Sequence, residues 1–189
     1  MPRSTREAAR SLRTTAQEQG GYFTAKQARR SGYDYPHLDY HLATEAFERV
    51  GHGLYRLADM ARPENEDLIR LSLWSRNRAD EPQAVVSHES ALVLHDLTEL
   101  LPNQVHLTVP PGFRKESPPG CVLHRSALSE GDVEERIGFR TTTPLRSLLD
   151  VAAGTTSQEQ LEKAVQDALD RGIVRRSKLA AAIGRTPGL

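Results

Sequence analysis

Apolar and polar residues alternate along the first third of the chain with the spacing of short helices. The segment 5–19 carries apolar residues on one side and predicts a helix that ends at a glycine pair. Thr24 and Gln27 have the spacing of a capping box, which predicts a second helix over 25–30. Gly32 follows this helix, where a residue that tolerates positive φ is needed. The pattern therefore predicts two helices in close succession.

A third helix is predicted over 36–46, because Pro36 suits the first turn of a helix. Leu38 and Leu42 lie four residues apart and are expected to face inward. The next eleven residues, F-E-R-V-G-H-G-L-Y-R-L, predict two short strands joined by a glycine turn. Three helices followed by a hairpin predict a winged helix-turn-helix over residues 1–62, and this class of domain binds nucleic acid.

The predicted DNA contacts come from the third helix and the wing. Base edges in the major groove are expected to be read from the helix, and phosphates or the minor groove to be contacted from the wing. Asp39 would repel phosphates, although a carboxylate can accept from cytosine N4. A small packed module that binds protein is the alternative. The candidates are His37, Tyr40, His41 and Thr44 on the helix, and Arg49, His52 and Arg56 around the wing.

The remaining residues, 63–189, predict a mixed α/β domain with a small sheet, so the whole chain is expected to be α+β. Ser87 is expected to cap a helix, and Thr143 another. Residues 104–110 alternate with the period of a strand, and 120–125 match them as a partner. Other predicted elements are a strand over 137–140, helices over 64–74, 157–172 and 178–183, and a loop that carries Glu134 and Glu135.

Composition narrows the class of protein. The chain has 189 residues, 38% of them hydrophobic, which suffices for ordinary cores. It contains no apolar run long enough for a membrane span, and its charged N-terminus does not resemble a secretory signal. We therefore expect a cytoplasmic protein without a membrane partner. The single cysteine, Cys121, excludes an internal disulfide and is interpreted as a small core residue.

Charge is unevenly distributed, although the net charge is zero. Residues 1–62 carry ten Lys and Arg against seven Asp and Glu, while the remainder carries fifteen against eighteen. The basic end coincides with the predicted DNA-binding domain. The first helix adds arginines at spacings of three and four residues, which either contact phosphates or form a solvated face; they are Arg3, Arg6, Arg10 and Arg13.

Histidines raise the question of a metal or catalytic site. His88 and His95 are seven residues apart on a predicted helix, and His106 and His124 fall on two predicted strands. A metal site would need three or four such groups to converge. Satisfied or exposed imidazoles are the preferred interpretation, and no catalytic residue, metal or cofactor is predicted. Ser87 beside His88 does not make a nucleophile, since neighbouring residues point in different directions.

Three segments of the chain resemble the AbiEi family of antitoxins from bacterial abortive-infection systems. They are G-Y-F-T-A-K-Q-A with R-V-G-H-G-L-Y-R-L, then V-S-H-E-S-A-L-V-L-H-D-L with V-H-L-T-V-P, and then F-R-T-T-T-P-L-R-S-L-L-D-V-A. The resemblance implies a winged helix-turn-helix that represses its own operon by binding promoter DNA. It also implies a C-terminal domain that counteracts a nucleotidyltransferase toxin in a type IV toxin-antitoxin system, without a stable grip on the toxin. Many relatives carry Arg or Lys on the recognition helix, whereas this chain does not.

Basic residues of the second domain are the candidates for neutralising the toxin. Simple pairing with neighbouring carboxylates is the alternative interpretation. A different function class also stays open, a stand-alone transcriptional regulator with a dimerisation or ligand-sensing C-terminal domain, and a third is an inactive relative of nuclease-linked proteins. The neutralising candidates are Arg114, Lys115, Arg125, Arg140 and Arg146.

Overall fold

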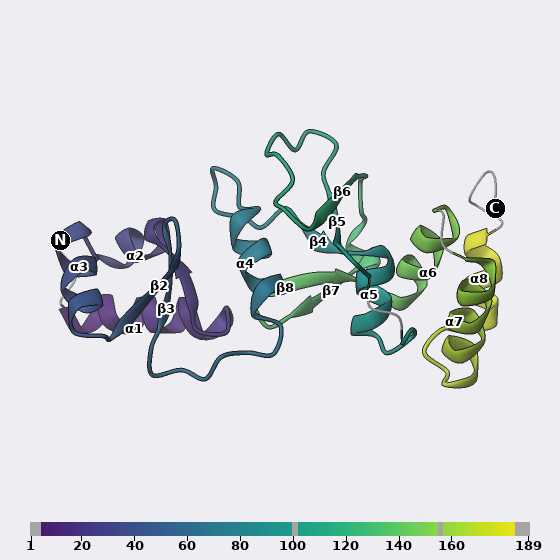
Figure 1. The fold of residues 1–189 in the computed structure, drawn as a ribbon, viewed down its shortest axis with the longest axis horizontal. Coiled ribbons are helices and arrows are strands. Elements are labelled where there is room, and N and C mark those ends of the chain that lie inside the picture. Colours follow the sequence, from purple (N-terminus) through teal and green to yellow (C-terminus); the bar gives the residue numbers. More distant parts are fainter. Residues whose placement is uncertain (1–4, 100–101, 155–156, 184–189) are drawn as a thin grey trace. The chain divides into compact units, whose positions relative to one another are not determined.

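The computed structural model describes residues 5–99, 102–154 and 157–183, so Arg3 lies outside the described residues. Two compact units account for the chain. Unit 1 comprises Met1–Pro82 with Ile137–Phe139, and unit 2 comprises Gln83–Arg136 with Arg140–Leu189. Helices and two small sheets make up these units (Figure 1), which confirms the predicted α+β class. None of the helices in the described ranges has the length and apolar character needed to cross a bilayer.

Unit 1 has the element order of a winged helix. A three-stranded antiparallel sheet of order β1-β3-β2 is preceded by one helix and interrupted by two more. The strands β2 and β3 form the wing, as the sequence predicted. In order, the elements are α1 Thr5–Glu18, β1 Tyr22–Thr24, α2 Ala25–Ser31, α3 Tyr35–Ala43, β2 Phe47–Gly51, β3 Leu54–Leu57 and α4 Glu66–Trp74.

The core of the winged helix is built around Phe23, which is fully buried on β1. Its ring meets Phe47 of β2 edge to face, with centroids 5.1 Å apart, and stacks on Tyr55 of β3 at 5.8 Å. Leu12 of α1 and Leu38 of α3 are each 1% exposed and belong to the same cluster. One aromatic core therefore ties α1 and α3 to the sheet.

The turn between α2 and α3 depends on local signals that the sequence predicted. Thr24 Oγ1 accepts from the backbone N–H of Gln27, and Gln27 Oε1 accepts from that of Thr24, which confirms the capping box. Gly32 ends α2 with φ 109°. A Cβ at this position would lie 3.3 Å from Cβ of Ala8, so glycine also lets α1 approach the turn.

Helix α4 packs within unit 1. The Tyr22 hydroxyl donates to Oε2 of Glu66 at 2.7 Å, and Ile69 is buried at 1% exposure. The sequence-based boundary between residues 62 and 63 therefore falls inside this unit. Residues 137–139 belong to the same unit. Gly138 packs closely on Ile69 of α4, since a Cβ added to Gly138 would lie 3.0 Å from the Ile69 side chain.

Unit 2 contains a five-stranded mixed sheet of order β6-β5-β4-β8-β7. β4 pairs antiparallel with β5 and parallel with β8, and β5 pairs parallel with β6. The predicted pairing of the strands around residues 106 and 122 is thereby confirmed. The elements are β4 Val85–Val86, α5 His88–Leu94, β5 Val105–Val109, β6 Cys121–Arg125, a 3-10 turn Glu130–Asp132, β7 Val133–Arg136, β8 Phe139–Thr142, α6 Pro144–Ala152, α7 Gln158–Asp170 and α8 Arg176–Ile183.

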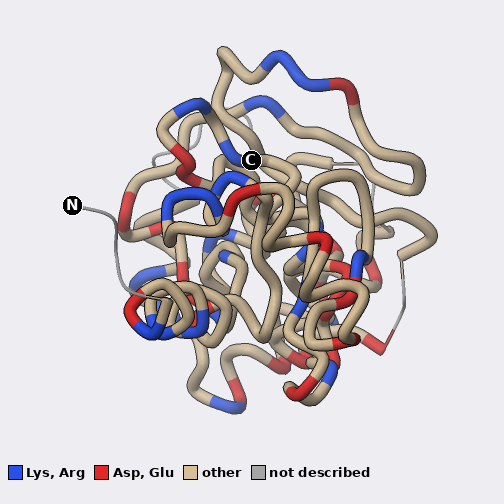
Figure 2. The backbone as a smooth tube through the Cα atoms, turned by 90° about the vertical axis from the view of Figure 1, so that its left-hand side faces the viewer, with Lys and Arg blue, Asp and Glu red and all other residues tan. Residues whose placement is uncertain are grey.

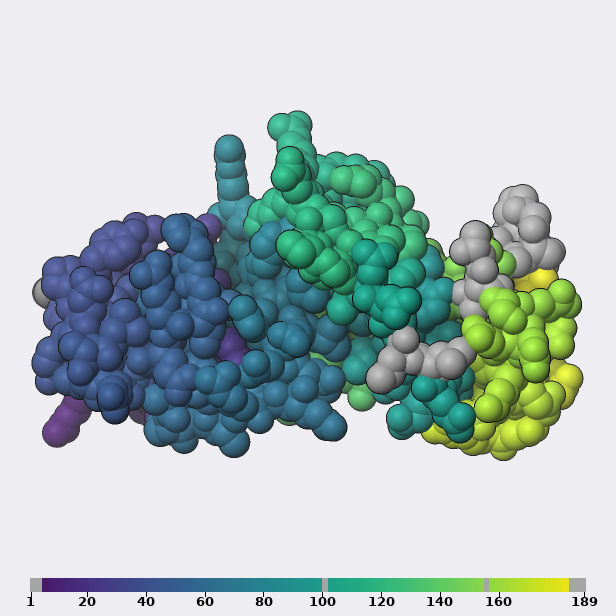
Figure 3. Space-filling model, in the orientation of Figure 1, coloured from purple at the N-terminus to yellow at the C-terminus, as the bar shows by residue number. Residues whose placement is uncertain are grey.

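Helices α5, α6 and α7 share a second apolar core. Leu92 of α5, Leu148 of α6 and Ala168 of α7 are at most 3% exposed and lie in one cluster. Leu179 of α8 packs against this cluster, and the side chains of α7 and α8 form one continuous surface in Figure 3. Thr143 Oγ1 accepts from the backbone N–H of Arg146, which confirms the predicted cap of α6.

Two local predictions for unit 2 are wrong. Glu134 and Glu135 lie on the strand β7 rather than in a loop, because Gly138, with φ 80°, turns the chain back into β8. Ser87 stands at the N-cap position of α5, but its side chain makes no capping hydrogen bond. Its Oγ instead accepts from Oγ1 of Thr108 at 2.8 Å, because β5 lies beside it.

Candidate nucleic-acid interface

Helix α3 occupies the position of a recognition helix. Asp34 caps it, since its carboxylate accepts from the backbone N–H of His37 at 3.0 Å. Leu38 is buried and Leu42 packs against the core of unit 1, as predicted. The opposite side of the helix faces solvent, and Tyr40 on it is 63% exposed.

Three of the four predicted helix contacts lie on this exposed side: His37, Tyr40 and Thr44. The Thr44 hydroxyl donates to the backbone carbonyl of Tyr40 at 3.1 Å, which leaves its oxygen with the capacity to accept a further hydrogen bond. His41 is placed differently. Its ring stacks on Phe47 with centroids 4.6 Å apart, and burial, followed by the charge of His37, lowers its pKa. We therefore interpret His41 as the edge of the aromatic core rather than as a base contact.

Two of the three predicted contact residues of the wing are exposed to solvent. Arg49 of β2 and His52 of the turn are exposed. Arg56 of β3 is only 3% exposed, and its guanidinium forms an ion pair with Glu48 at 2.9 Å and donates to the carbonyl of Met60. The prediction that Arg56 contacts phosphate is not compatible with this burial. The side chain is occupied by Glu48 on β2 and by the carbonyl of Met60 in the segment after β3.

Sequence reasoning missed a second exposed tyrosine on α3. Tyr35 is 61% exposed, and the guanidinium carbon of Arg29 lies 5.8 Å from its ring centroid, within the range of a cation–π contact. Its position directly before Pro36, at the start of the helix, is the signal that could have identified it. Tyr35 and Arg29 enlarge the exposed aromatic and basic surface at the N-terminal end of α3.

The charges around α3 are mixed. Asp34 lies 2.8 Å from Nδ1 of His37, and Asp39 is exposed on the same helix. On α1, Arg13 forms an ion pair with Asp59 at 2.7 Å, whereas Arg6 and Arg10 are exposed. Basic and acidic residues are interspersed along the chain (Figure 2). The exposed surface around α3 therefore carries charges of both signs.

The basic residues of unit 2 do not share one element. Arg114 and Lys115 are exposed in the loop that follows β5, and Arg125 is exposed at the end of β6. Arg140 lies on β8, which β5 and β4 separate from β6 in the sheet. Arg146 of α6 forms ion pairs with Asp150 at 2.8 Å and Asp132 at 3.5 Å. For Arg146 the structure therefore favours pairing with neighbouring carboxylates, the alternative interpretation.

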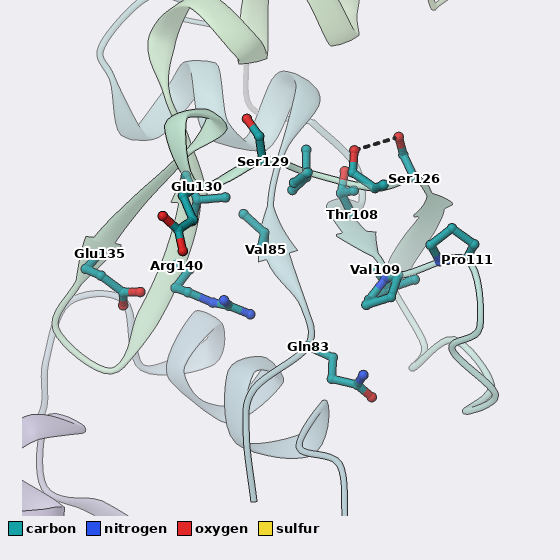
Figure 4. Close-up of a pocket in the computed structure, with 14 residues that line it drawn as sticks. Gln83, Val85, Thr108, Val109, Pro111, Ser126, Ser129, Glu130, Glu135 and Arg140 are labelled. Atoms are coloured by element: carbon teal, nitrogen blue, oxygen red, sulfur yellow. Dashed lines mark hydrogen bonds between the residues drawn. The ribbon is translucent and has the colours of Figure 1, made fainter. Parts of the chain in front are cut away.

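Arg140 lines a cavity of about 680 Å³ in unit 2. Glu130, Glu135 and Arg140 lie at one end of it, and Val109 and Pro111 lie at the other (Figure 4). The cavity thus combines a charged end with an apolar end, the composition typical of small-molecule sites.

The fold and the exposed helix define the class of the N-terminal domain, a winged helix-turn-helix. Residues 10–58 match the family model described as transcriptional regulator, AbiEi antitoxin. The match covers α2, α3 and the wing with most of α1, about a quarter of the chain, and confirms the resemblance found in the sequence. Over these residues the chain is similar to AbiEi antitoxin regulators. No curated protein matches the chain.

Proposed function

We propose that the protein is an antitoxin that represses its own operon through unit 1 and counteracts a nucleotidyltransferase toxin through unit 2. The observation that carries the proposal is the exposed side of α3. This helix packs on a winged-helix core and lies inside the segment that matches the AbiEi regulators. Promoter DNA and the toxin are the two partners in this proposal.

In the proposed complex, α3 enters the major groove and the wing follows the backbone. Tyr40, Thr44 and His37 reach base edges, since their side chains are exposed on α3. Arg49 and His52 contact phosphates from the wing. Occupation of the promoter by the protein blocks transcription.

Binding of the full-length protein to its upstream DNA tests the first half of the proposal. Exposed cations of unit 1 such as Arg6, Arg10 and Arg49 suggest about three phosphate contacts, so log K should fall with log salt with a slope of about −3. A promoter fragment should bind more tightly than a shuffled fragment of the same composition. Equal affinity for both fragments would contradict the proposal.

Growth of bacteria that express the neighbouring gene tests the second half. Co-expression of the wild-type protein should restore growth, and so should the variant Tyr40→Ala, because DNA binding and neutralisation are assigned to different units. Rescue by wild type but not by a combined Arg114→Ala, Lys115→Ala and Arg125→Ala variant would assign neutralisation to exposed cations of unit 2. A neighbouring gene without toxicity would contradict an antitoxin function.

The cavity of unit 2 supports one alternative, a stand-alone regulator that senses a small ligand. In that case a ligand bound beside Arg140 would change the affinity of unit 1 for DNA. Screening small carboxylates and phosphates for an effect on promoter binding distinguishes the alternatives, because an antitoxin without a ligand site shows none.

A further inference from the structure

Three histidines of unit 2 converge on one another. His88 opens α5, while His106 lies on β5 and His124 on β6. Each offers a nitrogen, and these three atoms all lie within 4.8 Å of one another. The parallel pairing of β5 with β6 brings His106 and His124 together. His106 lies opposite Val122 and His124 opposite Thr108, so the two histidines are diagonal neighbours, two positions apart in register.

The shortest separations in the cluster match the edges of a metal coordination sphere. Nδ1 of His106 lies 3.1 Å from Nε2 of His124 and 3.2 Å from Oε2 of Glu89. Ligands about 2.0 Å from a tetrahedral Zn²⁺ ion are separated by roughly 3.3 Å. His106 therefore already stands at a ligand-to-ligand distance from His124 and, separately, from Glu89.

The lone pairs of the cluster outnumber the protons that could satisfy them. Glu89 Oε2 and His124 Nε2 both approach the same nitrogen of His106, which carries at most one proton. A metal ion satisfies such surplus lone pairs, because its ligands bind through unprotonated atoms.

Two contacts with serine hydroxyls order the surroundings of the cluster in the absence of an ion. The backbone N–H of His106 donates to Oγ of Ser90 at 2.9 Å, which fixes β5 against α5. Nδ1 of His88 lies 2.9 Å from Oγ of Ser87. When Nδ1 of His88 donates to this hydroxyl, Nε2 keeps its lone pair for a metal. All three imidazoles are partly exposed, so an ion has access from solvent.

We propose that His88, His106 and His124 bind one divalent transition-metal ion, with Glu89 beside His106, and that Zn²⁺ is the fitting ion. Imidazole and carboxylate donors suit Zn²⁺, whereas Mg²⁺ prefers an all-oxygen octahedron. The rings of His88 and His124 stack with centroids 3.6 Å apart. Because imidazole lone pairs lie in the ring plane, the His88 ring tilts out of this stack when it joins the ion. The ion then links α5, β5 and β6.

Calorimetric titration of the metal-free, full-length protein with Zn²⁺ tests the proposal. We expect one Zn²⁺ per chain, and with Co²⁺ the visible absorption of tetrahedral coordination. His106→Ala and His124→Ala should each lower the affinity by more than ~100-fold, and Glu89→Gln by ~10–100-fold. Cys121→Ser, on the same strand as His124, is the matched control and should bind as wild type does.

Wild-type protein alone keeps the proposal testable if a histidine variant does not fold. Its thermal unfolding midpoint should rise in Zn²⁺ and stay constant in Mg²⁺, because an ion that binds only the folded state stabilises it. No stoichiometric binding of Zn²⁺, an unchanged affinity in both histidine variants, or an unfolding midpoint that Zn²⁺ does not raise would overturn the proposal.

Discussion

Arg56 and Glu48 form an ion pair across the two strands of the wing, with an N–O distance of 2.9 Å and an arginine side chain that is 3% exposed. Glu48 also contacts Arg62 at 2.8 Å. The pair fixes β3 against β2 at the register Glu48↔Arg56. Arg56 thus stabilises the fold of the hairpin, whereas Arg49 of β2 is exposed to solvent.

Arg56→Ala should destabilise the protein more than it affects DNA contacts. It removes the ion pair and the hydrogen bond to Met60, and the free energy of unfolding should fall by about 2 kcal/mol. This is less than for a fully buried pair, because Glu48 keeps Arg62 and is partly solvated. Urea unfolding measures the effect.

Arg49→Ala is the matched variant on the same hairpin. It should leave the free energy of unfolding unchanged and reduce the magnitude of the salt slope of DNA binding by ~1. An Arg56→Ala protein of wild-type stability, or an Arg49→Ala protein with an unchanged salt slope, would show that the two arginines have been assigned the wrong roles.

Tyr40→Ala should weaken binding to the promoter by ~1–3 kcal/mol, because the exposed ring and hydroxyl of Tyr40 are assigned to base contacts. Stability should change by less than ~0.5 kcal/mol at so exposed a site. Fluorescence anisotropy with promoter and shuffled DNA separates the specific loss from a general one. Tyr40→Phe tests the hydroxyl alone, and an unchanged affinity in Tyr40→Ala would mean that another face of α3 meets the DNA.

Gly32→Ala should lower the free energy of unfolding by ~1–3 kcal/mol, since the backbone at φ 109° is strained for any side chain. The new Cβ would also press on Ala8 at 3.3 Å. Gly53→Ala in the wing is the control: its φ is 63° and nothing lies within 4 Å of the added Cβ, so ~1 kcal/mol is expected. Thermal and urea unfolding should rank Gly32→Ala as the more damaging change.

Acidification of the metal-free protein should destabilise unit 2 through His88. Its pKa is about 4 in the folded protein and near 6.5 when unfolded, so the unfolded state binds more protons between these values. The stabilisation is fully present above pH 6.5 and is lost as the pH falls toward 4, by about 2 kcal/mol after allowance for solvent.

The comparison with His88→Asn isolates this contribution, because burial raises the pKa of Asp150, which acts in the opposite direction. Urea unfolding between pH 4 and 7, in the presence of a chelator, should give a flatter pH dependence for the variant. Parallel curves for the two proteins would show that His88 does not titrate as described.

Local signals explain why the winged helix could be predicted. The capping box of Thr24 with Gln27 and the stop at Gly32 involve residues within one turn of each other, so their chemistry is visible in the sequence. The burial of Arg56 could not be predicted, because Tyr55, Arg56 and Leu57 are all buried and the strand lacks the alternation that marks an outward side. The partner that satisfies Arg56 lies on another strand.

The histidine cluster shows the same limit over a longer distance. His106 and His124 could be placed on strands from their neighbours, but their approach depends on the parallel pairing of β5 and β6. His88 joins them rather than His95, since Nε2 of His95 contacts the carbonyl of Thr142 at 2.8 Å. Strand order decides which imidazoles meet, whereas helical spacing alone indicates only that His88 and His95 could share a helix face.

The position of the short strand β4 in the sheet has a consequence for the order in which the parts of the protein can fold during synthesis. β4 has two residues, and its parallel neighbour is β8, where Val86 lies opposite Thr141. Synthesis proceeds from the N-terminus, and domains tend to fold as they emerge. The middle of this sheet can form only after residue 142 has left the ribosome, whereas α1 to β3 are complete by residue 57. A nascent chain therefore holds its recognition helix well before the sheet of unit 2 closes.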